Sequence, residues 1–87
     1  KEQRRQRGYE AALATADELL NLRPGDQNAL LLRADMQAEL GRWDDAKTTY
    51  SAARKANPRN AAAKKGFFKA AKEVRKLERQ RKQGEQG

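Results

Sequence analysis

Apolar residues recur at spacings of three and four along most of the chain, with polar residues between them. That spacing places the apolar side chains on one face of an α-helix. The pattern is interrupted three times after Tyr9, so it forms four separate stretches. We predict an all-α fold, with helices at about residues 9–22, 27–40, 43–56 and 60–83.

Prolines and glycines account for these interruptions. Pro24 and Pro58 each follow the end of a stretch, because the residue before a proline is pushed out of the α region. Gly41 separates the two central stretches, and Gly8 breaks the pattern before the first one. At the other end of the chain, residues 84–87 are expected to form a frayed tail.

The two prolines also mark an internal repeat, because they lie 34 residues apart (58 − 24). At this offset Tyr9 aligns with Trp43. A 34-residue period made of a helix, a turn, a helix and a proline resembles the tetratricopeptide repeat family. The succession of Ala46, Tyr50 and Pro58 matches the second helix of that family's pattern.

The resemblance implies how the chain is organised. It divides a single domain spanning residues 1–87 into a partial repeat at 1–23, a complete repeat at 24–58 and a terminal basic helix at 59–83. About three repeats are normally needed for a stable stack. We therefore expect either that the domain is a fragment of a longer protein or that it lengthens its stack by self-association.

The core is expected to form around the complete repeat. One stripe at helical spacing contains Trp43, Ala46, Tyr50 and Ala53. Its large side chains can pack against its small ones. The helix at 27–40 is apolar over most of its circumference, which indicates packing on more than one side. Arg33 and Gln37 depart from the family's pattern in that helix.

Composition argues against an enzyme. The 87 residues include no cysteine and no histidine, which removes disulfides, thiolate metal sites and the commonest general base. The remaining carboxylates, lysines and hydroxyls form no recognisable catalytic motif, so we predict no catalytic residue, no cofactor and no metal site. No apolar run approaches the roughly 18 residues that a membrane span needs. We expect a cytoplasmic protein.

The net charge of +8 is concentrated in the last helix. Residues 60–83 carry nine basic and two acidic side chains, whereas residues 8–59 carry seven basic and eight acidic ones. The last helix therefore has an apolar stripe and a lysine-rich stripe. A basic amphipathic helix of this kind is typical of calmodulin targets and of membrane surfaces.

The family resemblance also implies a binding site. Tetratricopeptide proteins bind peptides in a groove lined by the first helix of each repeat, and a positive groove wall would favour an acidic peptide or protein. The candidate partner-binding residues come from aligning the chain with the family's repeat, and they include the phenylalanine beside the lysines. They are Asn28, Leu31, Asp35, Lys65, Phe68, Lys69, Lys72 and Lys76. The alternative for the lysines is a solvated face on a capping helix.

Other partners fit parts of the chain. The stretch from Asn57 to Lys82 resembles the end of the large immunophilin co-chaperones, which implies a co-chaperone scaffold. Its basic amphipathic character also suits a calmodulin-like partner, with Phe67 or Phe68 as the anchor. The alternative function is binding of RNA or another anionic surface through phosphate contacts, since there is no base-reading motif.

Overall fold

The computed structural model describes residues 2–86, with side chains described for residues 4–82 and 84. Four helices make up this part of the chain, and it contains no strand, so the prediction of an all-α fold is confirmed. The helices are α1 (Glu2–Leu22), α2 (Gln27–Glu39), α3 (Trp43–Ala56) and α4 (Ala61–Gln86). The outermost residues of the predicted partial repeat and tail, Lys1 and Gly87, lie outside the described residues.

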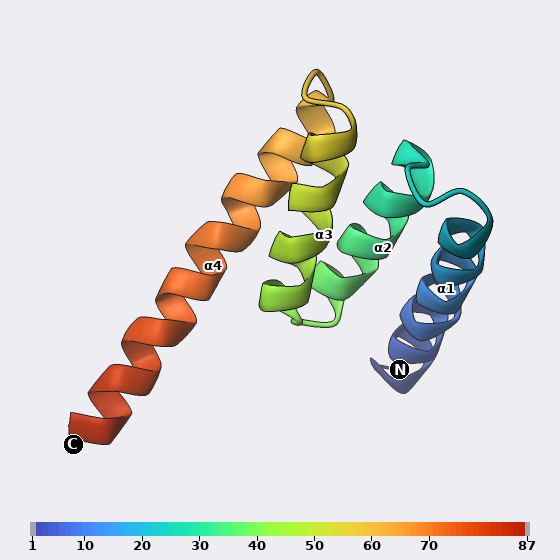
Figure 1. Ribbon diagram of the computed structural model, residues 1–87. Coiled ribbons are helices and arrows are strands. Elements are labelled where there is room, and N and C mark those ends of the chain that lie inside the picture. The colour runs from blue at the N-terminus through green and yellow to red at the C-terminus, as the bar shows by residue number, and fades with distance from the viewer. Residues whose placement is uncertain (1, 87) are drawn as a thin grey trace.

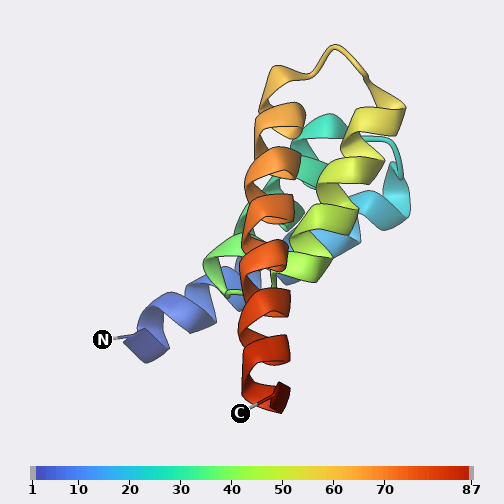
Figure 2. The same cartoon turned by 90° about the vertical axis from the view of Figure 1, so that its left-hand side faces the viewer.

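Consecutive helices run in opposite directions and pack side by side (Figure 1). The arrangement is a pile rather than a closed bundle, because α1 packs on α2, α2 on α3 and α3 on α4, with a smaller contact between α2 and α4. Figure 2 shows α4 lying across one side of the pile and extending beyond the other helices. One long side of α4 is therefore left uncovered.

The two proline turns have the same construction. Asp26 Oδ1 accepts a hydrogen bond of 3.1 Å from the backbone N–H of Ala29, and Asn60 Oδ1 accepts one of 3.2 Å from Ala63. Both side chains therefore satisfy an N–H group that the first turn of a helix leaves unpaired. The remaining turn, between α2 and α3, relies on Gly41, whose φ of 78° lies in the left-handed region that glycine adopts without strain.

The side chain of Gln27 joins the two proline turns. Its Nε2 donates a 3.1 Å hydrogen bond to the carbonyl of Ala53 at the end of α3. Its Oε1 accepts a 2.7 Å hydrogen bond from Nδ2 of Asn60, the capping residue of α4. One glutamine thus connects the start of α2 with the end of α3 and the start of α4.

The predicted stripe of α3 forms the centre of the core. Ala46, Tyr50 and Ala53 are buried, and the half-buried Trp43 packs against the cluster that contains Ala46 and Tyr50. The neighbouring helices contribute mainly small side chains, including Ala34 of α2 and Ala70 of α4, both fully buried. Large-into-small packing between adjacent helices is therefore the main apolar contact of this fold.

The two departures from the family's pattern in α2 are matched by polar partners. Gln37 is buried, and its Oε1 accepts a 2.7 Å hydrogen bond from Thr49 Oγ1 of α3. Arg33 Nη1 lies 2.8 Å from the Asp17 carboxylate of α1. The Gln37 amide therefore avoids the cost of a buried polar group without a partner. The Arg33 and Asp17 side chains are about half exposed, although Arg33 Nε makes no hydrogen bond among the described residues. The substitutions therefore keep α2 joined to both of its neighbours.

Four predicted helix ends differ from the structure, two of them by a single residue. Helix α4 begins at Ala61 rather than at residue 60. Helix α1 begins at Glu2 and passes through Gly8 without a break, whereas the sequence predicted a start at Tyr9. Helix α2 ends at Glu39, with Leu40 as its cap. Helix α4 continues to Gln86 through the region predicted as a frayed tail. A glycine inside a helix costs only about 1 kcal/mol relative to alanine, so an exposed one need not end it.

Gly66 of α4 lies directly against the Tyr50 ring of α3. A Cβ atom added at Gly66 would overlap the ring of Tyr50, whereas one added at Gly8 would have no atom within 4 Å. Both glycines are helical, so they differ in their surroundings rather than in their backbone. Glycine at position 66 is thus required by packing.

We predict opposite effects on stability when these two glycines are replaced. Gly66→Ala should lower the free energy of unfolding by about 1–3 kcal/mol, because the Tyr50 ring must move. Gly8→Ala, the matched control, should raise it by about 0.5–1 kcal/mol through helix propensity alone. Urea unfolding followed by far-ultraviolet circular dichroism measures both values. A Gly66→Ala variant as stable as the parent would contradict the packing described for α4.

Candidate functional site

A hollow lies between α2 and α4, with α3 beneath it. Its volume is about 290 Å³, and we call it the α2–α4 hollow. It is lined by Asp35, Met36, Ala38, Glu39, Trp43, Tyr50, Gly66 and Lys69. Two of the predicted binding residues, Asp35 and Lys69, therefore meet at one site although they lie on different helices.

A hydrogen bond from Tyr50 to Asp35 forms part of this lining. The Tyr50 hydroxyl donates to Asp35 Oδ1. Burial raises the pKa of Tyr50 above its usual range, and the hydrogen bond to Asp35 and the negative charges of Asp35 and Glu39 raise it further. The phenol is therefore neutral at physiological pH and acts as a fixed donor. It holds the Asp35 side chain in place and leaves Oδ2 available to another donor.

The two walls of the α2–α4 hollow carry opposite charges. Asp35 and Glu39 come from α2, whereas Lys69 comes from α4. The Lys69 ammonium lies 6.0 Å from the centroid of the Trp43 ring, at the outer limit of a cation–π contact. The hollow thus offers carboxylate acceptors on one side, an ammonium donor on the other and an indole ring between them.

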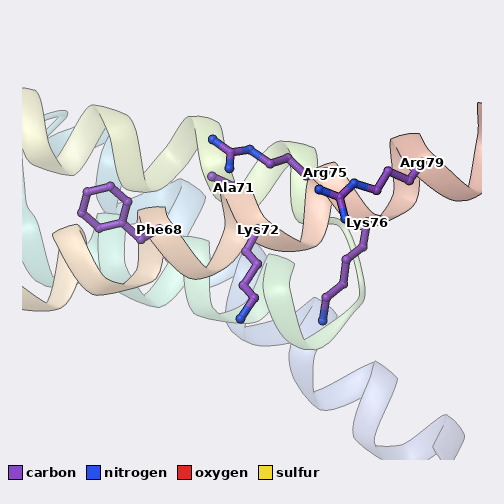
Figure 3. Close-up of a pocket in the computed structure, with 6 residues that line it drawn as sticks. All are labelled: Phe68, Ala71, Lys72, Arg75, Lys76 and Arg79. Carbon is purple, nitrogen blue, oxygen red and sulfur yellow. The ribbon is translucent and has the colours of Figure 1, made fainter.

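A second hollow lies on the side of α4 that faces away from the pile. Its volume is about 370 Å³, and we call it the outer α4 hollow. It is lined by Phe68, Ala71, Lys72, Arg75, Lys76 and Arg79 (Figure 3). Figure 3 shows the basic side chains spreading to both sides of the helix beyond Phe68. Three predicted residues, Phe68, Lys72 and Lys76, lie here rather than in the α2–α4 hollow.

Phe68 is exposed but held by its neighbours. Its side chain is 55% exposed, and its ring meets the ring of Phe67 edge-on, with 5.8 Å between centroids and an interplanar angle of 72°. The guanidinium carbon of Arg54 lies 5.5 Å from the Phe68 centroid and 4.7 Å from that of Phe67. Edge-on aromatic and cation–π contacts of this kind restrict the ring.

The other three predicted residues line neither hollow. Asn28 and Lys65 are exposed on α2 and α4. Leu31 is half-buried and packs against both clusters of the core. The predicted set is therefore distributed over two surfaces and the edge of the core.

Several lining residues were not among the predicted binding residues. Trp43 and Tyr50 were assigned to the core, where they do pack, but each also borders the α2–α4 hollow. Arg75 and Arg79 lie four residues apart on the same face as Phe68, so helical spacing could have indicated them. Glu39 had no signal in the sequence beyond its position four residues after Asp35.

The described residues contain neither a candidate metal site nor a candidate membrane span. Across the described part of the chain, no three His, Cys, Asp or Glu side chains are grouped so that they could hold a metal ion. Among the described helices, none is both long enough and apolar enough to span a bilayer.

Comparison with known proteins gives one match. A family model described as tetratricopeptide repeat matches residues 4–66, which include most of α1, all of α2 and α3 and the start of α4. Searches of curated proteins and of solved structures gave no match. The resemblance of the last helix to the immunophilin co-chaperones stays a prediction.

We predict that the Tyr50–Asp35 hydrogen bond supports the fold in a pH-dependent way. Tyr50→Phe should lower the free energy of unfolding by about 1 kcal/mol near neutral pH. Because the pKa of Tyr50 is raised by folding, its contribution is fully present below the unfolded value of about 10 and is lost as the pH rises through the folded value. The parent should therefore lose stability relative to Tyr50→Phe above about pH 10.

Urea unfolding of the parent and of Tyr50→Phe at a series of pH values measures this difference. Tyr9 and the lysines are present in both proteins, so their ionisation cancels in the comparison. A stability difference that stays constant into the alkaline range would contradict the buried, neutral phenol.

Proposed function

We propose that this chain, which belongs to the tetratricopeptide repeat family, is a non-catalytic scaffold that binds an acidic segment of another protein in the α2–α4 hollow. Stacked helix pairs of this family create concave surfaces that take up partner chains. The observation that supports the proposal is the meeting of Asp35, Trp43 and Lys69 between α2 and α4. These groups come from three successive helices.

The chemistry of the hollow suits an extended peptide. The Lys69 ammonium can pair with a carboxylate of the bound segment. Asp35 and Glu39, on the opposite wall, can accept hydrogen bonds from the segment's backbone N–H groups, which an extended chain leaves unpaired. The indole of Trp43 offers apolar area to a side chain between them. A single segment can therefore use both walls in spite of their opposite charges.

The distribution of charge favours an acidic partner. The chain carries a net charge of +8, and nine of its basic residues lie between residues 60 and 83. Lys65 lies four residues before Lys69, so it stands on the same side of α4 and extends the positive wall beyond the hollow. A positive surface of this kind steers an acidic protein toward the site and disfavours a basic one.

We predict that an acidic peptide binds in the α2–α4 hollow and that Lys69 determines its affinity. The probe is a synthetic peptide of about ten residues with alternating glutamate and valine, which favours an extended chain. Trp43, the single tryptophan of the sequence, lines the hollow and reports binding through its fluorescence. Lys69→Glu should weaken binding by about tenfold, because it replaces attraction with repulsion.

The matched control is Arg59→Glu, which makes the same change of charge in the exposed turn between α3 and α4. It should change the affinity by less than about twofold. Equal weakening by both variants would mean that general attraction, rather than the hollow, holds the peptide. Tighter binding of duplex RNA, with an affinity that falls steeply as salt rises, would favour the alternative of phosphate binding.

A further inference from the structure

The outer face of α4 corresponds to the face of α2 that receives α3. On α2, Ala34 packs with Tyr50 of α3, and Gln37 bonds to Thr49 of α3. The 34-residue offset that relates the two proline turns places Phe68 and Ala71 at the equivalent positions of α4. Within the described chain α4 contacts only α3 and α2. Among the described residues, none occupies over α4 the position that α3 occupies over α2.

The side chains on this outer face of α4 are suited to packing against a partner. Phe68 stands where α2 has the small Ala34, and it remains 55% exposed. Its ring is already ordered by contacts with Phe67 and Arg54. A partner that covers it would gain apolar burial without first having to fix the ring. Ala71, one turn further on, leaves room for a larger side chain of the partner.

The surroundings of Phe68 are basic. The described lining of the outer α4 hollow contains four cationic side chains and no carboxylate. Lys76 lies 3.4 Å from the Glu73 carboxylate at the edge of the hollow. The other three, Lys72, Arg75 and Arg79, take part in no ion pair among the described side chains. Their charge is therefore complementary to a partner that carries carboxylates.

The shape of the surface favours a helix as the occupant. The lining residues follow one another at spacings of three and one, which is a single stripe along α4. From Phe68 to Arg79 the stripe is about 16 Å long at 1.5 Å per residue, or three helical turns. The equivalent face of α2 is covered by α3, a helix of 14 residues. A partner helix of similar length would cover the whole stripe.

We propose that the outer α4 hollow is a second docking surface, which binds an acidic amphipathic helix of a partner protein. The apolar stripe of that helix packs on Phe68 and Ala71, and its carboxylates pair with Arg75 and Arg79. The partner helix lies over α4 as α3 lies over α2. The two hollows share no lining residue, so this proposal stands or falls independently of peptide binding in the α2–α4 hollow.

The test uses a designed peptide as the probe. It has about 14 residues, with leucines at helical spacing and glutamates elsewhere, and a scrambled peptide of the same composition serves as its control. Isothermal titration with the 87-residue chain should give binding at least about tenfold tighter for the amphipathic peptide. The peptide should also gain helical circular dichroism when it is bound.

Two pairs of variants locate the contact. Phe68→Ala and Arg79→Glu should each weaken binding of the amphipathic peptide by about tenfold. The control for Phe68→Ala is Leu22→Ala, which removes another exposed apolar side chain, 80% accessible at the end of α1. Arg81→Glu reverses an exposed charge two residues beyond Arg79, on the opposite side of α4. Both controls should leave the affinity within about twofold.

The NMR chemical shifts of the parent chain's backbone amides provide a measurement that does not depend on any variant. Shifts caused by the amphipathic peptide should cluster between residues 68 and 79 of α4. Equal binding of the scrambled peptide, or shifts centred elsewhere, would overturn the proposal. Tighter binding of another occupant to this face would also overturn it. Sedimentation detects a second copy of the chain. Duplex RNA or anionic vesicles would displace the peptide, and Phe68→Ala would weaken that competition.

Discussion

The structure depends on the contacts of one side chain, Tyr50. Its ring lies against α4 at Gly66, where a Cβ atom would overlap it, and its hydroxyl bonds to Asp35 of α2. Tyr50 itself belongs to α3, so a single side chain joins three helices. Because the close approach of α3 and α4 brings Lys69 near Trp43, the same contact that forms the core also shapes the α2–α4 hollow.

Polar contacts supplement this small apolar core. Gln27 connects the two proline turns, Gln37 bonds to Thr49 inside the core, and Arg33 pairs with Asp17 across α1 and α2. A fold whose core consists largely of alanines buries little apolar area for each residue. Directional hydrogen bonds between helices then help to specify how far each helix is shifted along its neighbour.

Helix α4 contributes to both candidate surfaces from different sides. Its Lys69 faces the acidic wall of α2, whereas Phe68 and Arg79 face away from the pile. The basic residues of α4 therefore act in two settings. One is a hollow with charges of both signs, and the other is a hollow without any carboxylate. Under the two proposals made above, the scaffold binds two acidic segments on separate surfaces.

Local sequence determined much of the fold. Helical periodicity and the two prolines were sufficient to place four helices and the stripe of α3, because these depend on neighbours within a few turns of one helix. The prediction of a helix break at Gly8 was wrong. The free energy that one glycine costs an exposed helix is smaller than the free energy that the surrounding residues contribute to it. The apolar and basic stripes of α4 were also visible, because spacing along one helix defines its faces.

Only the tertiary structure decided which residues of different helices come together. The need for glycine at position 66, the bond from Tyr50 to Asp35 and the pairing of Arg33 with Asp17 join residues of different helices. The same is true of the distribution of the predicted binding residues, of which two line the α2–α4 hollow, three line the outer α4 hollow and three line neither. These features depend on the distances and shifts between packed helices. Such distances arise from side-chain fit across interfaces, which no period along a single chain records.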